Sequence, residues 1–455
     1  MDRIKAILSR PTAYSRLQQE VDSQDGGESV RRPVAPKPEF SRGDYTVFVL
    51  LGIAMLWAWN MFLVASPYFE ERFAGDEWIK AHFQSAIISV ATVTNLGSML
   101  LLTNLQSGIT YPSRISWSCI INILTFSLLA VSTKAFTGAS AGGYLVFLLC
   151  MVFLSSLATG LSQNGVFAYV SGIGNQNYTH GVMTGQAVAG ILPPLAQIMT
   201  VLSAPADTVT DLKGRSTAAM NYFIIATLIS ALAMVAFGWH LRSNEYRTPV
   251  NADPASLTLP STSKPPEEEP KRHVPIIPLL IKMRWLVGAV FICFAVTMLY
   301  AVYTASIHSI HESIDTSHTS SKLNSFAVFV PLAFFFWNLG DLLGRLMTAL
   351  PNCNLSARPR FLFWFSLIRV VWVPMYYLCN IRNRGATVQS DVFYLVIIQF
   401  LFGLSNGWLG SNCMMGASSV QGLEEDAKEA AGGAMSMCLV AGLTAGSFLS
   451  FLVQT

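Results

Sequence analysis

The sequence predicts an all-α integral membrane protein with eleven transmembrane helices, arranged as halves of six and five. Two observations support this fold class. Of the 455 residues, 52% are hydrophobic and only 12% are charged, whereas a soluble domain has about a quarter of its residues charged. The apolar residues also gather in runs near the ~20 residues that a helix needs to cross a bilayer.

A long polar segment divides these runs. Residues 242–283 are rich in proline and contain the run Glu267-Glu268-Glu269, which is typical of a linker. We therefore expect a disordered cytosolic tail over 1–44, a six-helix bundle over 45–241, a cytosolic linker over 242–283 and a five-helix bundle over 284–455. Two bundles around a central path are typical of transporters built from related halves. The eleven expected spans are 45–69, 82–105, 115–133, 142–173, 178–203, 218–241, 284–311, 325–350, 360–380, 391–420 and 428–453.

The basic residues predict the orientation. Lysine and arginine favour cytoplasmic loops, and most of those outside the spans lie in the tail 1–44 and the linker 242–283. This distribution predicts a cytosolic N-terminus and, after eleven crossings, a C-terminus that is extracellular or in an organelle lumen.

Composition and motifs also argue against several classes of protein. A net charge of +3 is too small to indicate nucleic acid as a partner. The seven cysteines contain no C-x-x-C pair, so we expect neither a disulfide framework nor a zinc site. No phosphate-binding loop with lysine is present, and we expect no cofactor. His308, His311, Asp315 and His318 would align on one helical face, but a solvated rim is favoured over a metal or pH-sensing site.

Span 325–350 carries the clearest polar feature. An ionisable group in the bilayer core costs several kcal/mol unless it is paired or hydrated. Asp341 and Arg345 are four residues apart, so they share a helical face and are able to pair, and Asn338 lies one turn earlier. These side chains would hold a polar ligand by hydrogen bonds. The alternative is a structural ion pair that locks one bundle together.

Two further spans carry amides. Trp59-Asn60 lies near the middle of span 45–69 and offers stacking and hydrogen bonding, which suits a flat heterocycle; interfacial anchoring is the alternative. Gln163-Asn164 lies in span 142–173, where consecutive amides need partners across helices or in a cavity.

At these residues the chain resembles the equilibrative nucleoside transporter family. The similarity runs from about residue 52 to 451 and omits the tail and linker. The chain departs from the family at Ala58 and at Tyr303-Thr304, where prolines are usual. The matching motifs are Trp59-Asn60, Gln163-Asn164-Gly165 with Tyr178 and Gly185-Gln186, Asn338 with Asp341, Gly344 and Arg345, Ser405-Asn406-Gly407, and Glu429 with Ala431-Gly432.

The resemblance implies a fold related to the major facilitator architecture, alternating access around a central site, and a nucleoside or nucleobase as substrate. It further implies a monomer with no partner besides substrate and the lipid bilayer. The proline-rich linker is similar to that of fungal members, which implies a vacuolar membrane, with the plasma membrane as alternative. By position, the resemblance implies that Trp59 and Leu56 lie beside the ligand with Leu443 opposite. Gln163 or Asn164 would bind the base, and Asn60 and Asn338 are further binding amides. Asp341 and Arg345 would bind the ribose or hold the site in shape, and Arg114 and Glu429 would belong to a gate on the cytosolic side.

Two other functions are consistent with the same spans. One is a proton-coupled carrier for another polar solute, such as a sugar or peptide, with Asp341 as the proton site. The other is a non-transporting membrane enzyme or receptor, although the sequence offers no nucleophile–base pair for catalysis.

Overall fold

The computed structural model describes residues 40–105, 110–135, 138–203, 212–245, 274–311, 324–420, 423 and 425–454. Almost all of them are helical, and the described residues hold no strand beyond an isolated bridge between Ile307 and Ile381. The helices are α3 (Arg42–Val64), α4 (Ser66–Arg72), α5 (Glu77–Asn104), α6 (Tyr111–Ala135), α7 (Ala141–Ile173), α8 (Gln176–Ser203), α9 (Leu212–Glu245), α10 (Ile276–Lys282), α11 (Arg284–Thr304), α13 (Phe326–Met347), α14 (Pro359–Ile368), α15 (Trp372–Tyr376), the π-helix η3 (Phe393–Phe400), α16 (Leu401–Ala417) and α17 (Glu425–Gln454).

Ten of the described helical segments are long and apolar enough to cross a membrane. The expected span over 360–380 is not among them, because it forms three short consecutive pieces: α14, a 3₁₀ turn at Arg369–Val371 and α15. Pro374 lies inside α15 and lacks the N–H that a regular helix would use. The all-α membrane fold is confirmed, while the count of eleven crossings stays a prediction.

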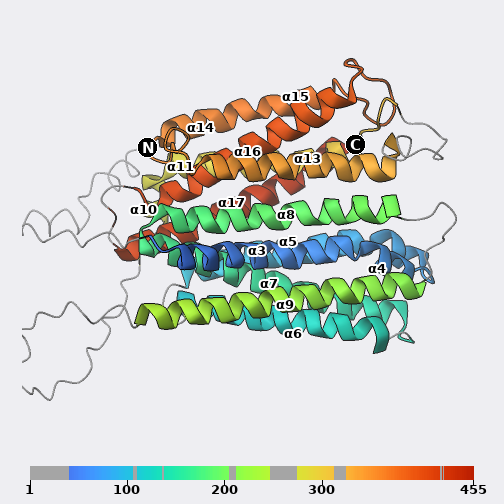
Figure 1. The fold of residues 1–455 in the computed structure, drawn as a ribbon, viewed down its shortest axis with the longest axis horizontal. Coiled ribbons are helices and arrows are strands. Elements are labelled where there is room, and N and C mark those ends of the chain that lie inside the picture. Colours follow the sequence, from blue (N-terminus) through green and yellow to red (C-terminus); the bar gives the residue numbers. More distant parts are fainter. Residues whose placement is uncertain are drawn as a thin grey trace, which may run out of the picture. The chain divides into compact units, whose positions relative to one another are not determined.

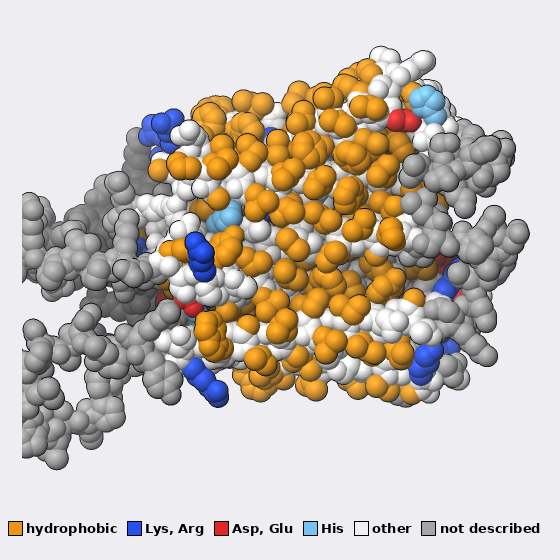
Figure 2. Space-filling view, viewed as in Figure 1, with side chains coloured by type: hydrophobic (Ala, Val, Ile, Leu, Met, Phe, Trp, Pro, Cys, Tyr) orange, Lys and Arg blue, Asp and Glu red, His pale blue; other side chains and the backbone are white. Residues whose placement is uncertain are grey.

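The surface agrees with a bilayer as the surrounding solvent. Figure 2 shows one face on which hydrophobic side chains cover the length of the helices, with charged side chains near their two ends. Large apolar residues such as Val235 (70% exposed), Leu101 (65%) and Leu228 (62%) would not be so exposed on a soluble protein of this composition. The protein is therefore a multi-pass membrane protein.

Helix packing joins the two expected halves, mainly along two pairs of helices. In the first half α3 lies against α8, and α6 lies against both α7 and α9. In the second half α13 packs on α16, and α11 packs on α17. Contacts between the halves run mainly through α7 with α17 and α8 with α13, and fewer join α5 to α17 and α8 to α16. In Figure 1, α8 accordingly lies between α3 and α13.

Four glycines allow α13 and α16 to touch backbone to backbone. A Cβ atom on Gly344 would lie 2.1 Å from the carbonyl oxygen of Leu404 in α16, and one on Gly340 would lie 2.1 Å from that of Phe400, the last residue of η3. One on Gly407 would lie 1.9 Å from the carbonyl oxygen of Asp341. Gly403 faces α13 in the same way, at 2.0 Å. Small residues at such spacing permit close helix approach in membranes. This contact fixes the position of Asp341 along the axis of α16.

The buried apolar residues form one shared core and two separate ones. We call the end of the helices at which α3 begins and α9 finishes the linker end, since the linker follows Glu245. There a single core joins both halves and includes Phe48, Phe167, Met414 and Ala434. At the opposite end the first half has its own core around Phe126 and Phe223. The second half has another, around Tyr376 and Phe402. The halves are thus joined at the linker end and pack independently at the opposite end.

Candidate functional site

The Asp341–Arg345 pair lies in the buried face of α13. Arg345 Nε donates to Asp341 Oδ2 at 2.8 Å, as the i, i+4 spacing predicts. The two residues are only 3% and 6% exposed. Burial at this depth demands that the remaining donors and acceptors also find partners.

The second carboxylate oxygen of Asp341 belongs to a polar network within the second half. Asn406 Nδ2 donates to Asp341 Oδ1 at 2.8 Å. The side-chain oxygen Oδ1 of Asn406 in turn accepts from Thr297 Oγ1 at 2.6 Å and from Arg369 Nη2 at 3.1 Å. Arg369 is 1% exposed and also donates to Ser405 at 3.1 Å. The network therefore contains two guanidinium groups, those of Arg345 and Arg369, and one carboxylate, that of Asp341.

Arg345 also crosses to the first half of the molecule. Its Nη1 donates to the carbonyl oxygen of Met183 at 2.6 Å and to Gln186 Oε1 at 3.3 Å. A ring nitrogen of His180 lies 3.1 Å from the carbonyl oxygen of Arg345. These partners lie on α8, so the α13 pair is also part of the contact between the halves.

A single turn of α8 receives amides from both sides. Asn60 on α3 donates to the carbonyl oxygen of Ala189 at 2.8 Å. Asn338 Nδ2 on α13 donates to the carbonyl oxygen of Phe334 in its own helix at 2.8 Å. Its side-chain oxygen Oδ1 lies against Gly190, 2.5 Å from the position that a Cβ atom would take there. The structure thus brings Asn60 and Asn338 to adjacent residues of α8.

The two neighbouring amides on α7 have different surroundings. Asn164 accepts from Arg114 Nη1 at 2.5 Å and donates to Thr103 at 3.3 Å. Gln163 is 7% exposed, and its Oε1 has no hydrogen-bond partner among the described residues. An unpaired buried oxygen is costly, so Gln163, and not Asn164, has an acceptor left for a ligand.

Arg114 and Glu429, expected at a gate, lie against the same helix. Arg114 on α6 is 1% exposed; it contacts α7 at Asn164 and donates to the carbonyl oxygens of Leu102 and Leu105 at the end of α5. Glu429 on α17 packs on α7 at Gly172, where a Cβ atom would lie 2.5 Å from its Cγ. Both contacts are at the linker end.

The three apolar residues expected to flank the ligand do not form a single cluster. Trp59 is partly buried and packs against the separate core of the first half. Leu443 packs against the shared core, and Leu56 is half-buried on α3. These three side chains therefore belong to different parts of the helix packing.

The contacts of several polar residues, inside and outside the site, were not expected from the sequence. Arg369 gave a signal, since it is a charged residue inside an expected span, but its partners come from other helices. Asp44 was assigned to the tail, yet its Oδ1 accepts from Nδ1 of buried His240 at 2.7 Å, a contact between α3 and α9. The histidine rim is partly described: His311 lies 3.2 Å from Asp391, while Asp315 and His318 fall outside the described residues. The described residues hold no group of three or more potential metal ligands.

Comparisons with known proteins agree with this arrangement. A family model described as "Nucleoside transporter" matches residues 149–455. Nucleoside transporter FUN26 of Saccharomyces cerevisiae is 29% identical over 446 residues, covering 90% of this chain and 83% of that protein. Equilibrative nucleoside transporter 1 of Rattus norvegicus is 27% identical over 462 residues, covering 90% and 96%.

Solved structures match the fold alone. The major facilitator superfamily transporter FucP in the outward conformation gives a TM-score of 0.54 at 12% identity, covering 90% of this chain and 92% of that chain. A bacterial homologue of the iron transporter ferroportin, in an outward-facing state, gives 0.53 at 10% identity, covering 91% and 93%.

Proposed function

The chain belongs to the nucleoside transporter family, and we propose that it moves nucleosides across a membrane by facilitative alternating access. It is a carrier, not an enzyme, as its relatives are named transporters. The alternative of a carrier for sugars or peptides has no support from these relatives. Nucleobases are a second substrate class that the same polar groups would accept.

The observation that carries this proposal is the meeting of polar groups from both halves on α8. Asn60 and Asn338 reach adjacent residues of this helix, and Arg345 reaches it two turns closer to the linker end. Amides in a membrane interior offer both donors and acceptors to an uncharged ligand. A neutral nucleoside also avoids most of the desolvation cost that a phosphate would bring.

Within this site we assign different roles to the polar residues. Gln163 Oε1 accepts a hydrogen bond from the base, because among the amides expected to bind the ligand it is the one whose buried oxygen has no protein partner in the described chain. Asp341 and Arg345 hold the site in shape, because both carboxylate oxygens of Asp341 and the Nε and Nη1 groups of Arg345 are already engaged. Trp59 and Leu56 flank the ligand on the first-half side, and Leu443 lies opposite.

The three cores support a direction for the opening. The halves share one core at the linker end and have separate cores at the opposite end, so the site opens toward the opposite end in this conformation. Arg114 and Glu429 belong to the closed gate at the linker end. We further propose that the linker end faces the cytosol, that the membrane is vacuolar, and that the protein acts as a monomer of a six-helix and a five-helix bundle.

Uptake into proteoliposomes tests the function. We expect reconstituted protein to take up radiolabelled adenosine or uridine, with competition by unlabelled nucleosides and none by glucose or dipeptides. Trp59→Ala should reduce uptake, whereas Trp117→Ala, at a 56% exposed position on α6, should not. Competition by sugars in the absence of nucleoside uptake would overturn the substrate class. Uptake with and without an imposed pH gradient separates passive from proton-linked transport.

A further inference from the structure

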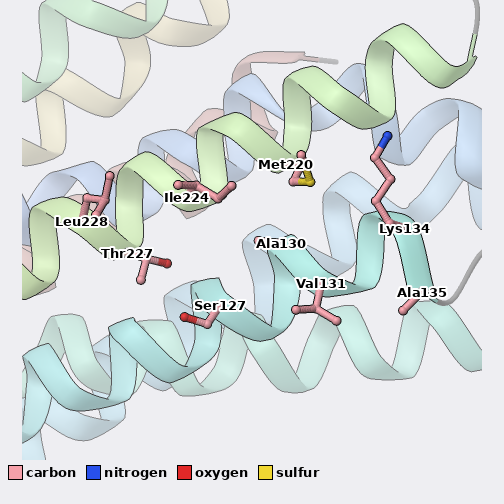
Figure 3. Close-up of a pocket in the computed structure, with 9 residues that line it drawn as sticks. All are labelled: Ser127, Ala130, Val131, Lys134, Ala135, Met220, Ile224, Thr227 and Leu228. Atoms are coloured by element: carbon pink, nitrogen blue, oxygen red, sulfur yellow. The ribbon is translucent and has the colours of Figure 1, made fainter.

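A groove on the surface of the first half is separate from the polar site. It lies between α6 and α9, has a volume of ≈ 610 Å³ and is lined by nine residues. Figure 3 shows apolar side chains of both helices along it, with Lys134 at one end. Ser127, at the other end, is 13 residues along α6 from Arg114, which corresponds to about 20 Å. The groove therefore lies well away from the gate residue on the same helix.

The groove opens onto the apolar surface of the helices. Val131 and Leu228, which line it, are 57% and 62% exposed. The neighbouring Leu124 and Leu232 are 59% and 57% exposed. In a membrane this surface faces hydrocarbon, so a lipid chain is the substance available to fill the groove.

The groove has the length of a lipid chain segment within one leaflet. From Ser127 to Lys134 the rise along α6 is about 10 Å, compared with about 15 Å for half of a bilayer core. Lys134 lies in the last turn of α6, at the end opposite the linker. The groove thus runs from the membrane surface toward the bilayer midplane.

Lys134 gives this apolar groove a charged entrance. Its Nζ donates to Thr217 Oγ1 on α9 at 2.9 Å, and the ammonium carries three N–H groups in all. An ammonium held at the membrane surface above an apolar channel is complementary to an anionic headgroup joined to an acyl chain. A sterol would match the channel but has no negative charge for Lys134.

We propose that this groove binds one phospholipid of the leaflet opposite the linker end, recognised through the negative charge of its phosphate. The phosphate lies on Lys134, and an acyl chain runs between Ala130 and Ile224 toward Leu228. The bound lipid fills the space between α6 and α9 and links the two helices at the outer edge of the first half.

The experiment uses the full-length protein in lipid nanodiscs with phosphatidylglycerol that carries a photoactivatable group on its acyl chain. We expect cross-links on the peptides around 127–135 and 220–228. Lys134→Gln should lower labelling there by roughly fivefold, the factor for one basic residue at an anionic lipid surface. Ile224→Trp, which fills the groove, should remove the label. Lys80→Gln, near the start of α5 at the same end, is the matched control and should label as wild type.

Correct folding of each variant is checked by its melting temperature and by nucleoside uptake, so a failure of the lipid proposal is distinct from a failure of the transport function. Uniform labelling over all membrane helices would overturn the proposal. Equal labelling of Lys134→Gln and wild type, or full displacement by cholesterol, would do so as well.

Discussion

Arg345 on α13 donates a 2.6 Å hydrogen bond to the backbone carbonyl of Met183 on α8. The same guanidinium holds Asp341 at 2.8 Å. One side chain thus connects the buried charge of the second half to the backbone of the first. Because this contact lies between the halves, any motion that separates α8 from α13 at the linker end has to break it.

Removing Arg345 should destabilise the protein strongly. Arg345→Leu leaves the buried carboxylate of Asp341 without its cation, a change that costs about 3–5 kcal/mol. We expect a lower melting temperature in detergent and loss of nucleoside uptake. The double variant Asp341→Asn with Arg345→Leu should regain part of the stability, since position 341 then carries no unpaired charge. Equal melting temperatures for the single variant and wild type would contradict the buried pair.

The two amides on α7 should respond in opposite ways. Gln163→Leu removes an oxygen that lacks a protein partner in the described chain, so stability should be unchanged or increase by about 1–3 kcal/mol. The KM for nucleoside uptake should nevertheless rise by about 2- to 12-fold, the factor for one net hydrogen bond.

Asn164→Leu provides the comparison. It removes an acceptor of buried Arg114 and should lower the melting temperature. If Gln163→Leu lowered stability while leaving KM unchanged, Gln163 would be structural and its assignment to the base would be wrong.

The glycine contact between α13 and α16 should not tolerate a methyl group. A Cβ atom on Gly407 would lie 1.9 Å from the carbonyl oxygen of Asp341, and the backbone on both sides is rigid. Gly407→Ala should therefore sharply reduce the yield of folded protein. Gly97→Ala is the matched control, because nothing lies within 4 Å of its Cβ position. It should be neutral or stabilising by up to about 1 kcal/mol. Folded yield by size-exclusion chromatography and melting temperature distinguish the two.

A cross-link at the linker end should stop transport. Glu429 Cγ lies 2.5 Å from the Cβ position of Gly172, so the two Cβ positions are within about 4 Å, a separation that a disulfide spans. The pair Gly172→Cys with Glu429→Cys, oxidised in liposomes, should lose uptake and regain it with dithiothreitol. Each single variant under the same oxidant is the control. Full uptake by the cross-linked protein would mean that this end does not open during transport.

The sequence was sufficient for the features that depend on local spacing. Apolar runs predicted the membrane helices, and the four-residue interval predicted the Asp341–Arg345 contact. Asn406 lies 65 residues from its partner Asp341 along the chain, and Met183 lies 162 residues from its partner Arg345. No local pattern relates such positions. Hydropathy did not predict that the helix over 360–380 is interrupted. A 3₁₀ turn and Pro374 change the backbone geometry without changing the polarity of the segment.

Amide residues show a second limit of sequence reasoning. Asn60, Gln163 and Asn164 are all amides within apolar runs of the sequence, yet their surroundings in the structure differ. Asn60 is bonded to Ala189 and Asn164 to Arg114, whereas Gln163 Oε1 has no partner among the described residues. Only the tertiary packing distinguishes an amide that is already satisfied from one that is available.

The shared core at the linker end implies unequal kinetics on the two sides of the membrane. Separating the halves there exposes apolar surface, which costs about 25 cal/mol per Å², whereas the described residues of the opposite end form no joint core. An unloaded carrier should therefore spend most of its time accessible from the far side. Solute arriving from that side binds at once, and solute arriving from the linker side waits for a rare rearrangement.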